Sequence, residues 1–215
     1  MAGTGAPAWE IEGVELLSVS CEIDDRTMTD VLPPALHPVI PPTAYFTVAR
    51  YPESPVGPFT LAQVRVGCRA ATLPRGFLLR AYAGAPRACE ALRANWGYAA
   101  RDADVRLQAF HDRIVGSVLA GGREILRVSL VNPEPISGAD VQYVSNVNLA
   151  KLAGDGGTGT LIQVDGEYRF HRADRGKPLI ETFERDAWSA AGVDPVYPIT
   201  ATFVRCDTGF PQIRY

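Results

Sequence analysis

The sequence has few lysines, few cysteines and no long apolar run, and each shortage excludes a class of protein. No stretch approaches the roughly 20 apolar residues that a membrane-spanning helix needs. The first ten residues, MAGTGAPAWE, have neither the basic region nor the apolar core of a secretion signal. A net charge of -3 gives no general basic field for nucleic acid. We therefore expect a cytoplasmic protein that binds neither membranes nor nucleic acid.

Residues that hold metals or perform covalent chemistry are also scarce. The four cysteines are scattered without a CxxC pair, and the three histidines are just as dispersed. This spacing predicts reduced packing thiols, without disulfides, a metal site or a bound cofactor. Lys151 and Lys177 are the two lysines, so a mechanism that needs an amine nucleophile has two candidates.

What is present is typical of one globular domain. The chain has 215 residues, of which 47% are hydrophobic and 21% are charged. We expect a single domain over residues 1–215, with residues 1–10 as a loose N-terminus. A small molecule is the expected partner, and a homo-oligomer is left open. The bias towards arginine, alanine and glycine is what a high-GC genome produces, which fits bacterial secondary metabolism.

Short alternating segments separated by proline and glycine dominate the pattern. Representative segments are 14–19, 44–50, 61–66, 76–82, 114–119 and 124–131, and Gly121 and Gly122 mark a hairpin turn. A short helix is expected over residues 25–32. The pattern predicts a mainly β (α+β) fold, an antiparallel barrel or sandwich with a few short helices.

The segment from Pro86 to Leu107 predicts a helix, a turn and a strand. Proline is favoured at a first helical position, and Gly97 suits a left-handed helix end. Cys89, Leu92 and Trp96 recur at helical spacing and form one apolar stripe. The chemistry of the segment is expected at the turn after Gly97.

The order of these pieces resembles the acetoacetate decarboxylase family over nearly the whole chain. The matching pieces are the loop Glu53-Ser54-Pro55-Val56-Gly57-Pro58-Phe59, the helix with Leu92-Arg93-Ala94, the turn Gly97-Tyr98-Ala99-Ala100, and Asn146-Val147-Asn148-Leu149-Ala150-Lys151. The resemblance implies a closed antiparallel β-barrel or cone with helices outside and a small-molecule cavity inside.

The same resemblance shows what this chain lacks. The lysine of the family's Gly-Tyr-Pro-Lys turn, which forms a Schiff base with a ketone, aligns with Ala100. The neighbouring basic residue aligns with Arg101, which cannot supply a neutral amine. The family's arginine on its first strand aligns near Val14. We therefore expect the fold without Schiff-base decarboxylation.

Three residues are the candidates for catalysis. Glu53 matches a cavity glutamate of the family and could act as general acid or base, or be a solvated loop residue. Tyr98 could donate to a substrate oxygen or pack in the barrel wall. Arg101 could hold an enolate or carboxylate, or point outward. The substrate pocket is expected to be lined by Ala100, Tyr82, Trp96 and Phe59, although the stripe position of Trp96 favours core packing.

These expectations give a function with two alternatives. The leading hypothesis is a cofactor-independent cyclase, isomerase or lyase that orients a ketone-rich or polyketide-like molecule and stabilises an enolate. The first alternative is a non-catalytic binding protein for small molecules. The second is a β-keto acid decarboxylase with a different acid and base arrangement.

Overall fold

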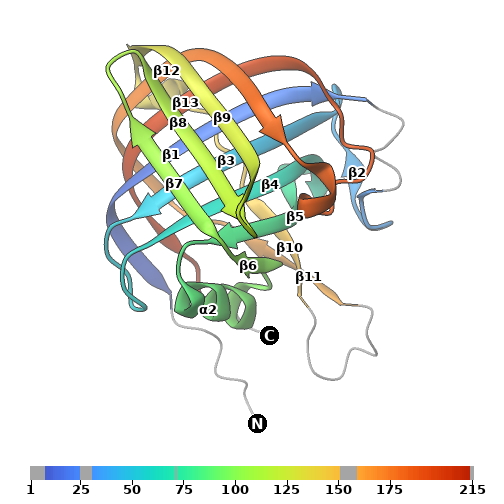
Figure 1. Cartoon of the computed structure of the whole chain (residues 1–215). Coiled ribbons are helices and arrows are strands. Elements are labelled where there is room, and N and C mark those ends of the chain that lie inside the picture. Colours follow the sequence, from blue (N-terminus) through green and yellow to red (C-terminus); the bar gives the residue numbers. More distant parts are fainter. Residues whose placement is uncertain (1–7, 25–30, 71, 151–158, 214–215) are drawn as a thin grey trace.

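A computed structural model describes residues 8–24, 31–70, 72–150 and 159–213, which form one curled sheet and one α-helix (Figure 1). The helix is α2 (Pro86–Trp96), and two short 3-10 helices are η2 (Gly138–Asp140) and η3 (Arg185–Trp188). The strands are β1 (Trp9–Ile23), β2 (His37–Pro38), β3 (Thr43–Tyr51), β4 (Phe59–Ala70), β5 (Leu73–Ala83), β6 (Ala100–Asp102), β7 (Asp104–Ala109), β8 (Arg113–Ala120), β9 (Arg123–Ile136), β10 (Asn146–Ala150), β11 (Thr160–Val164), β12 (Tyr168–Phe183) and β13 (Pro195–Phe210). The expected mainly β class is confirmed. The helix expected over residues 25–32 lies mostly outside the described residues.

The sheet is nearly all antiparallel and follows the order β11-β10-β5-β4-β3-β1-β13-β12-β9-β8-β7. Strand β5 pairs in parallel with β6 and β10, whereas its pairing with β4 is antiparallel. No hydrogen-bonded ladder joins the described ends of the path, β7 and β11, so the expected closure of the barrel is not seen in the pairing. Instead the sheet curls until β7 packs against β3, β4 and β5. Figure 1 shows β7, β8 and β9 crossing in front of β3 and β4.

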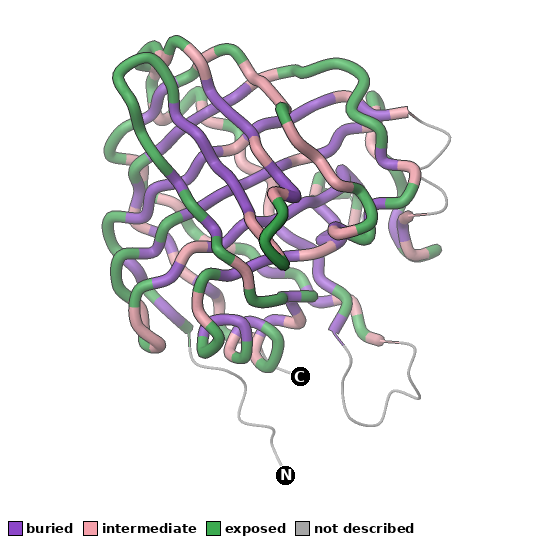
Figure 2. The backbone as a smooth tube through the Cα atoms, in the orientation of Figure 1, coloured by how far each residue is buried: buried purple, intermediate pink, exposed green. Residues whose placement is uncertain are grey.

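The alternation of side chains along each strand creates two apolar cores on opposite faces of the sheet. In β3, Phe46 and Val48 face the interior enclosed by β7, β8 and β9, which we call the barrel core. Ala49 and Tyr51 face the other side, where α2 lies, which we call the helix-side core. Buried segments run through most strands in Figure 2. The sheet therefore has a second enclosed face, and the turn after α2 packs into it.

Helix α2 ends as its sequence predicts. Gly97 has φ of +64°, and the Tyr98 N–H donates to the Leu92 carbonyl at 3.2 Å. A Cβ on Gly97 would lie 2.6 Å from the Cβ of Ala150, so glycine is required for both conformation and space. The predicted apolar stripe is buried, including Leu92 and Trp96. The helix end thereby fixes the position of the turn that follows.

Two further expectations can be checked in the fold. The predicted hairpin joins β8 to β9, and Gly121 and Gly122 adopt φ of +58° and +77°, as its tight turn requires. Among the described helices none is both long and apolar enough to cross a bilayer.

Candidate functional site

The turn after α2 directs alternate residues to opposite sides. Tyr98 and Ala100 are buried in the helix-side core, and Ala100 is only 3% exposed. Ala99 and Arg101 are exposed. Ala100, which the sequence predicts to stand in place of the family's lysine, therefore faces the enclosed side of the sheet, although its methyl group offers no chemistry.

Tyr98 is held by a buried amide from β10. The Asn146 Nδ2 lies 3.0 Å from the Tyr98 phenol oxygen and donates to it, and it also donates to the Gln63 Oε1 at 2.6 Å. Asn146 and Gln63 are both buried. Because the Asn146 amide donates to the phenol oxygen, the Tyr98 hydroxyl keeps its own hydrogen to donate.

Arg65 completes this network with a buried positive charge. The side chain comes from β4 and is 1% exposed. Its Nη1 donates to Asn146 Oδ1 at 2.7 Å and to the Val144 carbonyl, and lies 3.5 Å from the Tyr143 hydroxyl. The guanidinium carbon lies 5.7 Å from the ring centre of Tyr45 and 5.1 Å from that of Tyr143. Every one of these partners is neutral.

No described carboxylate forms an ion pair with Arg65. A buried charge without a partner of opposite charge costs several kcal/mol, so folding alone gives no reason to keep it. The Arg65 Nε has no hydrogen-bond partner, and neither do Thr47 Oγ1 and Asn148 Oδ1 among the described residues. We call Arg65, Asn146, Tyr98 and Gln63 the buried polar network. It has the charge and the free donors to hold an anionic oxygen.

Burial controls the protonation of the tyrosines around this network. Desolvation raises the pKa of Tyr98, and the neighbouring Tyr143 phenol raises it further. Burial likewise raises the pKa of Tyr51 and of Tyr168. These phenols therefore stay neutral donors at physiological pH and do not act as bases.

A large open cavity lies at one end of the sheet and has a volume of about 1440 Å³. Trp9, Tyr168 and Phe210 contribute aromatic side chains to its lining, and the exposed Glu53 lines it as well. We call it the mouth cavity. It is lined by residues from β1, β12 and β13 and from the loops 52–55, 165–167 and 211.

Two tyrosines connect the mouth cavity to the buried polar network. The rings of Tyr168 and Tyr143 are 4.3 Å apart between centres, and Tyr143 in turn lies over Arg65. Both tyrosines are partly exposed. A ligand in the mouth cavity is therefore separated from the Arg65 guanidinium by these two side chains.

The wall of the mouth cavity contains an ordered carboxylate, Asp207. Its oxygens accept from the Arg169 guanidinium and from the Gly13 N–H at 3.1 Å, and lie 2.8 Å from His171 Nε2. These contacts, led by Arg169, lower the pKa of Asp207 to about 2. Register shifts next to Gly13 and His171 aim both groups at the same carboxylate.

The three catalytic candidates from the sequence do not meet in one place. Tyr98 is buried in the network, whereas Glu53 is exposed at the mouth cavity. Arg101 is exposed on β6, where it is the strand partner of Tyr82 of β5, and it makes no ion pair with a described residue. Lys177 is exposed on β12, and Lys151 lies outside the described residues. The guanidinium near Tyr98 therefore belongs to Arg65.

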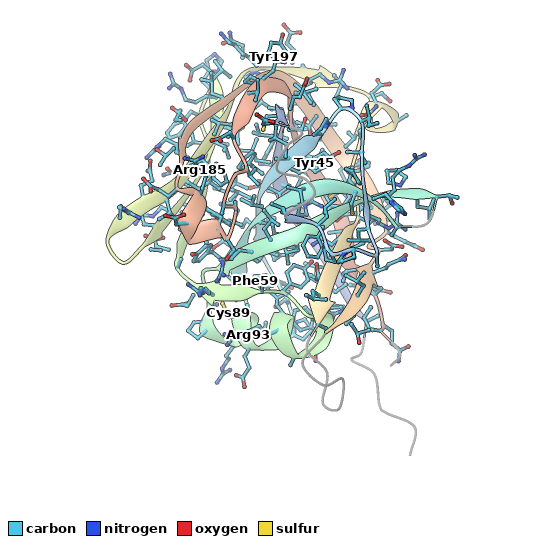
Figure 3. All side chains as sticks on the ribbon, turned by 90° about the vertical axis from the view of Figure 1, so that its right-hand side faces the viewer. Tyr45, Phe59, Cys89, Arg93, Arg185 and Tyr197 are labelled. Atoms are coloured by element: carbon cyan, nitrogen blue, oxygen red, sulfur yellow. The ribbon has the colours of Figure 1, made fainter. Side chains whose placement is uncertain are left out.

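The four expected pocket residues are all buried, and three of them share the helix-side core. Ala100, Trp96 and Phe59 lie there, and Figure 3 shows Phe59 above Cys89 of α2. Trp96 packs edge-on against Trp9 with 4.8 Å between ring centres, as expected for a core residue. Tyr82 lies in the barrel core instead and donates its hydroxyl hydrogen to the Ala187 carbonyl at 2.8 Å. None of the four lines the mouth cavity.

Sequence reasoning missed Arg65, Gln63 and Tyr143. Alternation over residues 61–66 indicates that Gln63 and Arg65 share a face, but it leaves open whether that face is buried. Polar residues that alternate within a strand normally indicate the face of the strand that is exposed to solvent. The informative signal was an arginine and a glutamine in the strand that follows the Glu53 loop.

Comparisons with known proteins agree on the fold. The model of the family described as acetoacetate decarboxylase (ADC) matches residues 3–171. A search of curated proteins gave no match. The acetoacetate decarboxylase from Legionella pneumophila aligns with a TM-score of 0.86 and 17% identity, covering 97% of this chain and 87% of that one.

Two other solved structures share the fold of this chain at low sequence identity. The enduracididine biosynthesis enzyme MppR, complexed with pyruvate, has a TM-score of 0.77 and 12% identity over 95% of this chain and 88% of its own. An acetoacetate decarboxylase-like enzyme from Sphingomonas wittichii RW1 has a TM-score of 0.70 and 15% identity, covering 96% of this chain and 92% of its own.

Among the described residues, no group of three or more histidine, cysteine or acidic side chains is placed to hold a metal ion.

Proposed function

This chain belongs to the acetoacetate decarboxylase family, and we propose that it is an enzyme that acts on a ketone-rich, polyketide-like small molecule without forming a Schiff base. Alanine at position 100 supports the absence of an imine, because the family's lysine aligns with it. The reaction class is a cyclisation, an isomerisation or an elimination that passes through an enolate.

The observation that carries this proposal is the unpaired, buried charge of Arg65. An enolate carries its negative charge on oxygen, and a guanidinium fixed in a site without water stabilises such a charge far more than solvent does. The neutral hydroxyl of Tyr98, oriented by Asn146 at 3.0 Å, adds a second donor close by. The network is already assembled, so little reorganisation is needed when charge develops.

The remaining catalytic role is that of a base, and Glu53 is the candidate. A polyketide-like chain carries several carbonyl groups, so one carbonyl can reach Arg65 when Tyr143 and Tyr168 move aside, while another part of the chain remains in the mouth cavity beside Glu53. In the proposed step an α-carbon loses its proton to the Glu53 carboxylate, and the electron pair of the broken C–H bond moves onto the carbonyl oxygen as an enolate.

The enolate can then react in three ways, and in each of them the abstracted proton is returned. Return of the proton to a different carbon isomerises the substrate. Attack of the enolate carbon on a second carbonyl forms a ring and an alkoxide, which takes the proton back from Glu53. Loss of a β-hydroxyl group as water, with the proton supplied by Glu53, completes an elimination. The similarity to MppR, an enzyme of enduracididine biosynthesis by its description, supports a role in secondary metabolism.

A second candidate function follows from the same arginine. Arg65 could bind a carboxylate, which supports decarboxylation of a β-keto acid through an acid and base arrangement other than an imine. Release of carbon dioxide from a panel of β-keto acids would favour this candidate. A non-catalytic binding protein would bind the same ligands without changing them.

Borohydride reduction in the presence of acetoacetate tests the lysine-free part of the proposal. We expect the intact mass of the protein to stay unchanged. An irreversible adduct on Lys151 or Lys177 would refute it. Exchange of α-protons for deuterium in a panel of ketones then separates an enzyme from a binding protein, because binding without proton transfer leaves the rate at that of buffer.

A further inference from the structure

A second cavity lies beside the turn after α2, and no residue of the buried polar network lines it. It has a volume of about 640 Å³, which is within the range of sites for small organic ligands. We call it the outer groove. It is lined mainly by apolar residues, Val31, Phe77, Leu78, Leu79, Gly97, Ala99, Leu149, Ser189, Ala191 and Gly192. Leu149 is 40% exposed there.

Two arginines lie on the side of β5 that meets this groove. Arg80 donates from Nε to the Ser189 hydroxyl oxygen at 3.1 Å, and Ser189 lines the groove. Tyr82, two residues along the same strand, reaches the Ala187 carbonyl of η3, so both side chains point at η3. Arg101 is the strand partner of Tyr82 and lies on the same face. The two guanidinium groups are therefore close enough to repel each other, and Ser189 connects Arg80 to the lining of the groove.

No carboxylate in the described part of the chain neutralises these two charges. Neither Arg80 nor Arg101 forms an ion pair with a described carboxylate, and Glu184 and Asp194 near η3 pair with Arg123 and Arg185. Burial lowers the pKa of Arg80, and the nearby charge of Arg101 lowers that pKa further because the two cations repel each other. An anion placed between them would remove this repulsion.

We propose that the outer groove binds a phosphate ester with an apolar chain, with the phosphate held by Arg80, Arg101 and the Ser189 hydroxyl. The Ser189 oxygen already accepts from Arg80, so its hydrogen can be donated to the ligand. A tetrahedral dianion has enough oxygens for two guanidinium groups and a hydroxyl, whereas one carboxylate is satisfied by a single guanidinium fork. The apolar chain covers Phe77, Leu79 and Leu149.

This site is independent of the proposed enolate chemistry, since it uses none of the buried polar network. Binding of the phosphate ester is measured directly and does not require turnover. Failure of one proposal therefore does not affect the other. Arg101, which the sequence singled out as an anion holder, keeps that role here with a different neighbour.

Isothermal titration calorimetry with octyl phosphate at low salt tests the proposal. We expect saturable binding of one octyl phosphate per chain, and weaker binding of both inorganic phosphate and octylammonium. Arg101→Gln should weaken binding about tenfold, because a charge-assisted hydrogen bond is lost at an exposed side chain. Ala191→Trp, which fills the groove, should weaken it as well.

Arg106→Gln is the matched control, because Arg106 is an exposed arginine on β7 that pairs with Asp104. It should bind octyl phosphate like the parent protein. Equal affinity for octylammonium, unchanged binding by Arg101→Gln, or an equal loss in Arg106→Gln would each overturn the proposal. Melting temperatures of all variants establish that a loss of binding is not a loss of folding.

Discussion

Asn146 Oδ1 accepts a hydrogen bond of 2.7 Å from Arg65 Nη1, while the amide nitrogen of the same side chain donates to Tyr98. One buried side chain thus joins a cation on β4 to the phenol in the turn after α2. The stability of the protein and its proposed chemistry both depend on this link.

Asn146→Leu should destabilise the protein by about 2–4 kcal/mol, because it removes one buried hydrogen-bond partner each from Arg65, Gln63 and Tyr98. Urea unfolding gives the change in free energy. The control is Gln108→Ala, an exposed position on β7, which should stay within about 0.5 kcal/mol of the parent. A similar small change for Asn146→Leu would show that the network contributes little to folding.

Ala100→Lys should give a protein that acetoacetate and borohydride label. A lysine buried at this position has its pKa lowered by desolvation, so a neutral amine is present near pH 7. Ala99→Lys is the matched control, since its side chain is exposed in the outer groove and should stay protonated and unlabelled. Mass spectrometry of folded protein measures both. A folded Ala100→Lys variant without an adduct would contradict the alignment of Ala100 with the family's lysine.

Gly97→Ala should cost more stability than Gly121→Ala. Both glycines have positive φ, at +64° and +58°, so both substitutions carry the backbone strain of about 1 kcal/mol. A Cβ at position 97 would also meet Ala150 at 2.6 Å, whereas nothing lies within 4 Å of a Cβ at position 121. Thermal or urea unfolding compares the two. Equal losses would mean that α2 and β10 do not pack as closely as the structure shows.

Asp207 should make the free energy of unfolding depend on pH in the acid range. Its pKa is about 2 in the folded protein and near 3.8 without the contacts of Arg169, Gly13 and His171. A lowered pKa means that the contribution is fully present above pH 4 and is lost as the pH falls from about 4 to about 2. The melting temperature of Asp207→Asn should therefore fall below that of the parent at pH 6, with the gap narrowing towards pH 2. A gap that is constant with pH would contradict this account.

Local signals in the sequence predicted local structure well. Proline at the start of α2, Gly97 at its end and the glycine pair between β8 and β9 each determine a conformation through their own backbone. The face of each strand follows from alternation. Such features depend on a few adjacent residues, so a single sequence contains them.

The site depended on contacts that a single sequence does not reveal. Arg65, Asn146 and Tyr98 come from β4, β10 and the turn after α2, and they meet because the sheet order places β4, β5 and β10 side by side. The same dependence on long-range pairing explains why closure of the barrel was expected from the family resemblance and is not seen in the hydrogen bonds between the described strands. Arg101 was singled out by its neighbour in the chain, whereas the guanidinium near Tyr98 comes from a distant strand.

The central claim is that Arg65 stabilises an enolate in the buried site. The most direct measurement is the rate at which α-protons of a ketone panel exchange with deuterium, followed by proton NMR, in the parent protein and in Arg65→Gln. The account predicts exchange above the buffer rate for at least one ketone, and a fall of at least about tenfold in folded Arg65→Gln. Equal exchange in both proteins would contradict it.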